Sequence, residues 1–254
     1  MSKIIAVANQ KGGAGKTTTS TSLAGALQLM GKKVLLVDCD AQCNATDTYG
    51  AQTEGVCTLF DVMTRQGTVE EGIQHREAGD ILPSDPDLKD IDEQLVRDIG
   101  KNFRLREELA PVSKQYDYVI LDTPPQLGLM LVNALIAANS IIVPMTPDRY
   151  SIAGLSQLSQ TISDVRKYFN PELRIEGLLL TKYDAREVLS KETIETLPEA
   201  AKFMGTELFD VKIRTSMGIR RAQAERHGLF IGNTAKSTGA EDFKALAKII
   251  AERG

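Results

Sequence analysis

The chain has 254 residues and a formal net charge of −4, so any affinity for nucleic acid must come from a local basic patch. Hydrophobic residues make up 42% and charged residues 25%, which is typical of a folded globular protein and excludes a disordered one. Three cysteines without CxxC spacing, no apolar run near ~18 residues, and a strand at the N-terminus lead us to expect a cytoplasmic protein with no signal peptide.

The first predicted strand, loop and helix form the pattern of a phosphate-binding loop. Residues 4–8 are an apolar run, and residues 17–30 carry apolar side chains at helical spacing. The intervening glycines let backbone N–H groups point inward, and the helix adds its positive dipole end. The predicted nucleotide-binding residues are Gly12, Gly13, Ala14, Gly15, Lys16, Thr17 and Thr18. We expect Lys16 to reach the β- and γ-phosphates and the Thr17 hydroxyl to ligate Mg²⁺.

Two further predicted strands end in carboxylates. Residues 32–40 form a predicted strand that ends with Asp38 and Asp40. These two side chains lie on the same side of the strand, because side chains alternate along it. Acids at this end of a parallel strand suit metal and water chemistry, although they could also flank a loop and cap the next helix. Residues 116–122 are an apolar strand ending in Asp122. This fits the Walker B arrangement, in which the carboxylate holds Mg²⁺, although any strand can end in Asp.

The rest of the chain alternates between predicted helices and strands. Between residues 58 and 110 the pattern is weaker, with short helices predicted over 69–75 and 87–98. Clearer patterns follow, with helices predicted over 128–138 and 150–169 and strands over 140–145, 174–180 and 207–213. The C-terminal segment, residues 239–253, carries Phe243, Leu246, Ala247 and Ile250 on one face. Its basic and acidic residues balance, so we predict a helix docked on the core and no membrane contact.

A basic segment, residues 214–228, is the candidate contact for double-stranded DNA. The candidates are Arg220 first, then Arg221, Arg226 and Arg214, with Arg186 from a neighbouring loop. At about 100° per residue, Arg220, Arg221 and Arg226 fan around a helix instead of forming one stripe. Arg221 is also spaced for an i,i+4 ion pair with Glu225, so a solvated helix face is the alternative.

These motifs together resemble the ParA/MinD group of deviant Walker A ATPases, and most closely its ParA (Soj) branch. The loop reads Lys-Gly-Gly-x-Gly-Lys-Thr, with Gln10 where the common G-x-x-x-x-G-K-[ST] pattern has Gly, and with a second lysine, Lys11. The D-x-D-A-Q stretch from Asp38 is similar to the family's D-x-D-P-Q, and Asp122 opens its D-T-P-P. Counting back from the His-Gly ending at 227–228 aligns Arg220 with the family's DNA-contacting arginine.

The resemblance implies roles for individual residues, and it implies that the loop of residues 181–186 lies near the nucleotide base. Asp40 would orient the attacking water, Asp38 would lie near the metal, and Lys11 would reach across a dimer to the partner's nucleotide. It also implies Mg²⁺-dependent ATP hydrolysis, a homodimer formed on ATP, and nonspecific, nucleoid-associated DNA binding. A ParB-like centromere-binding adaptor would stimulate hydrolysis and release the DNA. Lys11 has no obvious target within its own subunit.

Other functions stay open at this point. One is a MinD-like membrane-associated or other cargo-positioning ATPase. Another is a reductase-type relative with a bridging iron–sulfur cluster, which needs downstream cysteines, and none follows Cys57. A purely structural nucleotide-binding module is weaker, because Asp40 and Asp122 would then serve no purpose. The alternation of strands and helices predicts one P-loop NTPase α/β domain over residues 1–254, with a largely parallel twisted sheet of about seven to eight strands and helices on both faces.

Overall fold

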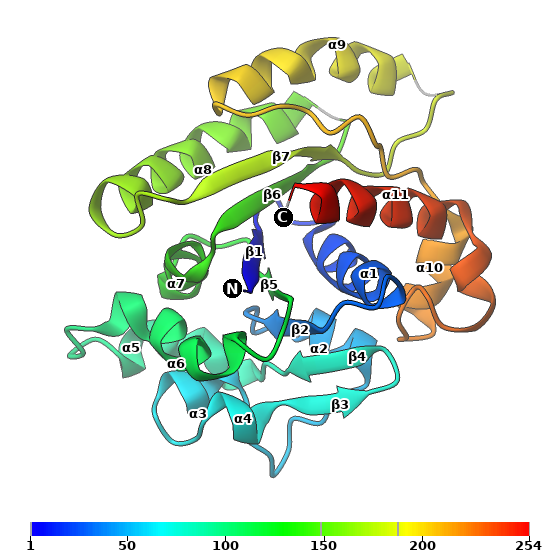
Figure 1. Ribbon diagram of the computed structural model, residues 1–254. Coiled ribbons are helices and arrows are strands. Elements are labelled where there is room, and N and C mark those ends of the chain that lie inside the picture. Colours follow the sequence, from blue (N-terminus) through cyan, green and yellow to red (C-terminus); the bar gives the residue numbers. More distant parts are fainter. Residues whose placement is uncertain (1, 148, 187, 254) are drawn as a thin grey trace.

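A single seven-stranded sheet organises the chain in the computed structural model, which describes residues 2–147, 149–186 and 188–253. The strand order is β3-β4-β2-β5-β1-β6-β7, and every pairing is parallel except β3 with β4 (Figure 1). The strands are β1 Lys3–Val7, β2 Val34–Asp38, β3 Gln74–Arg76, β4 Gly79–Leu82, β5 Tyr118–Asp122, β6 Ser140–Met145 and β7 Arg174–Leu180. The predicted α/β fold is confirmed.

Helices cover both faces of the sheet. The α-helices of the described residues are α1 Lys16–Leu29, α2 Asn44–Tyr49, α3 Leu59–Met63, α4 Val69–Gly72, α5 Ile91–Gln94, α6 Arg104–Ser113, α7 Leu129–Ala137, α8 Arg149–Tyr168, α9 Val188–Phe203, α10 Met217–Ala224 and α11 Thr238–Glu252. Short 3₁₀ turns occupy Pro86–Asp90, Lys101–Phe103 and Gly232–Lys236.

Two hydrophobic cores lie on opposite faces of the sheet because side chains alternate along each strand. In β1, Ile5 and Val7 belong to the core beneath α1 and α11, whereas Ala6 joins the core beneath α6, α7 and α8. Helix α11 packs along α1, as Figure 1 shows in red and blue, and its Phe243 is fully buried. The predicted core docking of the C-terminal helix is therefore confirmed. None of the helices in the described part of the chain has the length and hydrophobicity needed to cross a bilayer.

Three predicted elements were wrong in detail. The segment 207–213 is not a strand, because the chain bends at Asp210 and leaves only isolated bridges, at Leu208 and Arg214, beside β7 and the loop that follows it. The helix predicted over 69–75 ends at Gly72, and the next residues pair with β4 as the antiparallel edge strand β3. The helix predicted over 87–98 breaks into the 3₁₀ turn Pro86–Asp90 and the single turn of α5.

Candidate functional site

The site lies at the carboxyl edge of three neighbouring strands. Strands β2, β5 and β1 are adjacent, and their register places Asp38 opposite Asp122 and Asp122 opposite Val7. The phosphate loop follows β1, so the loop and the two carboxylates meet at one edge. Ligands of open parallel sheets bind at this edge, beyond the ends of the strands.

The phosphate loop has the backbone shape that anion binding requires. Gly13 and Gly15 have φ values of +75° and +89°, a region that favours glycine, and α1 begins directly after Gly15. A side chain on Gly12 would meet no atom within 4 Å, so the outer face of the loop is open to a ligand. The Thr181 hydroxyl donates a hydrogen bond to the Ala14 carbonyl oxygen at 2.9 Å, which anchors the loop to the end of β7.

Lys16 is the buried cation of the site. Its side chain begins the first turn of α1 and only 7% of the residue is exposed. Burial lowers the pKa of Lys16, and the negative charges of Asp122 and Asp40 oppose that shift. A lysine held at a helix N-terminus between two carboxylates and an open loop is placed to bind a phosphate anion.

Asp122 has the geometry of a metal ligand. It is fully buried, and the hydroxyl groups of Ser20, at 2.9 Å, and Thr17 donate hydrogen bonds to it. Its second oxygen, Oδ2, is buried without a hydrogen-bond partner among the described residues. A buried, unpaired carboxylate oxygen beside a threonine hydroxyl fits Mg²⁺, which needs only one or two protein ligands when phosphates and water complete its shell.

Asp38 holds the loop that carries Asp40. Its Oδ2 accepts hydrogen bonds from the backbone N–H and the hydroxyl of Thr46, both at 2.8 Å, and its Oδ1 accepts from the backbone N–H of Asp40 at 3.2 Å. These contacts occupy both oxygens of Asp38, so its contribution to a nearby metal is its charge. Asp40 itself is only partly buried and lines the open groove with Lys16.

When neither nucleotide nor Mg²⁺ is bound, we expect the substitution Asp122→Asn to make the folded protein more stable at high pH. Burial, followed by the charge of Asp38, raises the pKa of Asp122 to about 7, from 3.8. Between about pH 4 and pH 7 the folded state therefore holds a proton on Asp122 that the unfolded state releases. The contribution of Asp122 to the free energy of unfolding thus rises as the pH falls from 8 toward 4. The variant should have a Tm higher by about 5 °C at pH 8, and the difference should shrink at pH 5.5.

Thermal unfolding followed by circular dichroism at both pH values measures this difference. Asp164→Asn, at an exposed position on α8, is the control and should change Tm equally little at both. A difference for Asp122→Asn that is independent of pH would contradict the assignment of a costly buried carboxylate.

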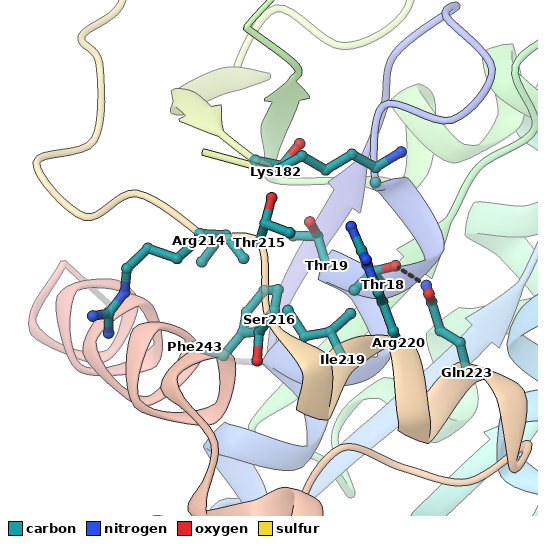
Figure 2. Close-up of a pocket in the computed structure, with 13 residues that line it drawn as sticks. Thr18, Thr19, Lys182, Arg214, Thr215, Ser216, Ile219, Arg220, Gln223 and Phe243 are labelled. Atoms are coloured by element: carbon teal, nitrogen blue, oxygen red, sulfur yellow. Dashed lines mark hydrogen bonds between the residues drawn. The ribbon is translucent and has the colours of Figure 1, made fainter. Parts of the chain in front are cut away.

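Two hollows flank the phosphate loop. The first, the phosphate groove, has a volume of about 570 Å³ and is lined by Gly12, Gly13, Lys16, Thr17 and Asp40 among others. The second, the base pocket, has a volume of about 270 Å³ and lies between α1, the loop after β7, α10 and α11 (Figure 2). Its lining includes apolar atoms of Ile213, Ile219 and Phe243. An anion-binding groove that joins a partly apolar pocket suits a nucleotide.

Lys11 does have a partner within its own chain, contrary to the expectation from sequence. Its Nζ donates a hydrogen bond to the Thr146 hydroxyl oxygen at 3.2 Å, at the end of β6. Its backbone N–H is held by the Asn9 side chain at 2.9 Å. To reach a second subunit, the Lys11 side chain must leave Thr146.

The five candidate arginines do not form one patch. Arg220 extends from α10 toward Thr18 and lines the base pocket (Figure 2). Arg221 is exposed and pairs with Glu225 at 2.7 Å. Arg226 is not on the predicted helix, because α10 ends at Ala224. Arg226 follows α10 with a φ of +50° and lines the phosphate groove. Its guanidinium group lies 3.8 Å from the Asp47 carboxylate.

Arg214 and Arg186 lie on adjacent segments and are each engaged by carboxylates. The backbone N–H of Thr215 donates to the carbonyl of Tyr183 at 2.9 Å, which joins the two segments. Arg214 is bidentate with Asp242 on α11, with its Nη2 2.7 Å from Oδ1. Arg186 is bidentate with Asp184, with its Nη2 2.7 Å from Oδ2. A phosphate would have to compete with these carboxylates.

Two residues that line both hollows were missed from sequence. Gln223 donates from Nε2 to the Thr18 hydroxyl oxygen at 2.8 Å, and Lys182 lies above the loop (Figure 2). No motif marks Gln223. The resemblance did place the loop of residues 181–186 near the nucleotide base, but Lys182 itself was not predicted as a site residue.

Comparisons with known proteins agree with this geometry. A family model described as an AAA domain matches residues 2–175. The sporulation initiation inhibitor protein Soj of Bacillus subtilis is 40% identical to this chain, and the alignment covers 100% of both chains. The chromosome partitioning protein ParA of Myxococcus xanthus is 34% identical, over 99% of this chain and 88% of its own.

A solved structure from Mycobacterium smegmatis is also similar. It is described as cobyrinic acid a,c-diamide synthase with bound ATP analogue and magnesium. It superposes with a TM-score of 0.88 at 29% identity, over 100% of this chain and 95% of that chain. Identity to Soj and ParA is higher and extends over nearly the whole chain. This chain therefore belongs to the ParA/Soj family of deviant Walker A partitioning ATPases.

Proposed function

We infer that the protein is an ATP-dependent DNA-partitioning ATPase of a chromosome or plasmid. It dimerises face to face on ATP, binds duplex DNA nonspecifically as that dimer, and is released when a ParB-like adaptor stimulates hydrolysis. The observation that carries this inference is a phosphate loop with a second lysine, Lys11, beside an open groove lined by Lys16 and Asp40, with the buried carboxylate of Asp122 near Lys16. Identity of 40% to Soj over the full chain supports it.

The residues in and beside the groove would have separate roles in ATP hydrolysis. Lys16 and the loop N–H groups would bind the phosphates, and Thr17 with Asp122 would hold Mg²⁺, with the charge of Asp38 nearby. Mg²⁺ would neutralise charge on the β- and γ-phosphate oxygens. Asp40, whose Oδ1 accepts from the backbone N–H of Gln42 at 3.0 Å, is held on a turn at the groove and would orient the attacking water.

The DNA-binding surface would be centred on α10. Arg221 is the cleanest test there, because its side chain is 59% exposed and it does not line the base pocket. Arg220 has no ion-pair partner in the described part of the chain, but its place beside Thr18 makes it a residue that could affect nucleotide binding as well. Arg226, Arg214 and Arg186 remain candidates whose present carboxylate partners a DNA phosphate would replace.

Arg221→Ala should weaken ATP-dependent DNA binding about equally for any duplex sequence. Each lost phosphate contact should reduce the slope of log affinity against log salt by close to one unit. Filter binding over a salt series, with ATP and with ADP, measures the slope, and titration with a fluorescent ATP analogue should show unchanged nucleotide affinity.

Lys114→Ala makes the same change of charge at an exposed position after α6 and should leave the slope unaltered. If the wild-type protein showed no ATP-dependent DNA binding even at low salt, the arginines of α10 would be a solvated face. The protein would then position some other cargo through another surface.

A further inference from the structure

The base pocket and the phosphate groove share part of their lining, and we call this shared part the neck. Four residues line both hollows: Gly15, Thr18, Lys182 and Gln223. Gly15 and Thr18 belong to the phosphate loop and the start of α1. Lys182 and Gln223 come from the loop after β7 and from α10, and they approach Thr18 from opposite sides (Figure 2). A nucleotide with its base in the pocket and its terminal phosphates at Lys16 must pass between them.

The side-chain amide of Gln223 already makes a hydrogen bond within the protein. Its Nε2 donates to the Thr18 hydroxyl oxygen at 2.8 Å, so this amide positions Thr18 and holds α10 against α1. The hydroxyl proton of Thr18 is still available to a ligand, because a hydroxyl can accept one hydrogen bond and donate another. On the opposite side of the neck, Lys182 supplies the charged group.

The backbone of Lys182 is held in a costly conformation that directs its side chain over the phosphate loop. Its φ is +53°, in the left-handed region, which costs a residue other than glycine ~1–2 kcal/mol. Hydrogen bonds on both sides fix this turn: Thr181 N–H donates to the Met145 carbonyl at 2.7 Å and Tyr183 N–H to the Ile213 carbonyl at 3.0 Å. The Nζ of Lys182 lies 3.9 Å from the position that a Cβ on Gly13 would occupy.

Lys182 also differs from its basic neighbours in its partners. Arg186 on the same loop is paired with Asp184, and Arg214 on the adjacent segment is paired with Asp242. Within the described ranges, no carboxylate lies at ion-pair distance from Lys182. A lysine without a counter-ion, held by a strained turn over an anion-binding loop, is available to an anionic ligand.

We propose that Lys182 is a third nucleotide-binding lysine, which contacts the ribose and first phosphate of the nucleotide at the neck. The inference rests on the proposed function in taking ATP and ADP as the ligands. The first phosphate is common to both nucleotides, so Lys182 contributes equally to their binding. Its role thus differs from that of Lys16 at the terminal phosphates and from that of Lys11 in the dimer.

Isothermal titration of ADP and of ATPγS, each with Mg²⁺, tests this role. Lys182→Met removes the charge at nearly constant length and should weaken both nucleotides about 10-fold, with a smaller dependence of affinity on salt. Lys182→Arg should restore affinity to within about 3-fold of wild type. Lys182→Gly accepts φ +53° without strain and also lacks the charge, so it should show the same loss as Lys182→Met while unfolding at no lower temperature.

The matched control is Lys212→Met. Lys212 lies 5.1 Å from the ring centre of Tyr183 on the neighbouring segment but lines neither hollow, so its loss should leave both affinities unchanged. The proposal is overturned if Lys182→Met and Lys182→Gly bind both nucleotides within 2-fold of wild type. It is also overturned if only ATPγS is weakened, because Lys182 would then act on the terminal phosphate. A wild-type protein that binds neither nucleotide would instead overturn the proposed function itself.

Discussion

Lys16→Ala should lower the affinity for ATP by about 100-fold. Lys16 is the buried cation at the start of α1, and a charged hydrogen bond to phosphate contributes ~1.5–3 kcal/mol. Its loss also leaves the negative charges of Asp122 and Asp40 without the lysine that offsets them, which repels the phosphates further. Titration with a fluorescent ATP analogue in the presence of Mg²⁺ measures the affinity.

The control for this experiment is Lys32→Ala, which removes the same charge from an exposed position after α1. Its affinity should equal that of the wild type. Unchanged affinity in Lys16→Ala, with the control behaving as expected, would refute the assignment of the phosphate loop.

Lys11→Ala should separate nucleotide binding from the later steps. The monomer should still bind ATP, because Lys16 and the loop backbone are intact. Dimerisation and hydrolysis should be lost together, because the proposed target of Lys11 is the nucleotide of the partner subunit. Gel filtration with ATP and Mg²⁺ reports the dimer, and phosphate release reports turnover, which should fall to the background rate.

Thr146→Val distinguishes this role from a structural one. It removes the hydroxyl that accepts from Lys11 Nζ within the same chain, at 3.2 Å, and leaves Lys11 itself unchanged. We expect ATP-dependent dimers and turnover to survive in this variant. Wild-type dimerisation and turnover in Lys11→Ala would indicate a conventional site that is complete within one subunit.

Local features of the sequence were enough to predict most of the fold and the centre of the site. The apolar runs that became β1, β2 and β5 and the glycine spacing before Lys16 are recognisable within about ten residues. The apolar runs before them also placed Asp38 and Asp122 at strand ends, where the structure has them. The family assignment rested on the same short motifs, and the comparisons confirmed it. The proposed roles of Lys11 and Asp40 stay predictions.

Helix and strand ends in the weaker regions needed the tertiary structure. A run of β-type residues such as 207–213 becomes a strand only if a neighbouring strand pairs along its whole length, and the bend at Asp210 prevents that. Similarly, residues 74–76 form β3 because β4 is there to pair with them, although their own pattern favoured a helix.

The contacts of the basic residues were also decided by tertiary structure. Sequence spacing correctly gave the Arg221–Glu225 pair, since those residues lie one helical turn apart. It could not show that Arg214 meets Asp242, that Gln223 meets Thr18, or that Lys182 lies over Gly13. Arg214 and Asp242 are 28 residues apart in sequence, and Gln223 and Thr18 are 205 apart. Such partners meet only because α10, α11 and the loop after β7 pack around α1. Periodicity determines which face of an element is buried, whereas contacts between distant polar side chains depend on how the elements pack.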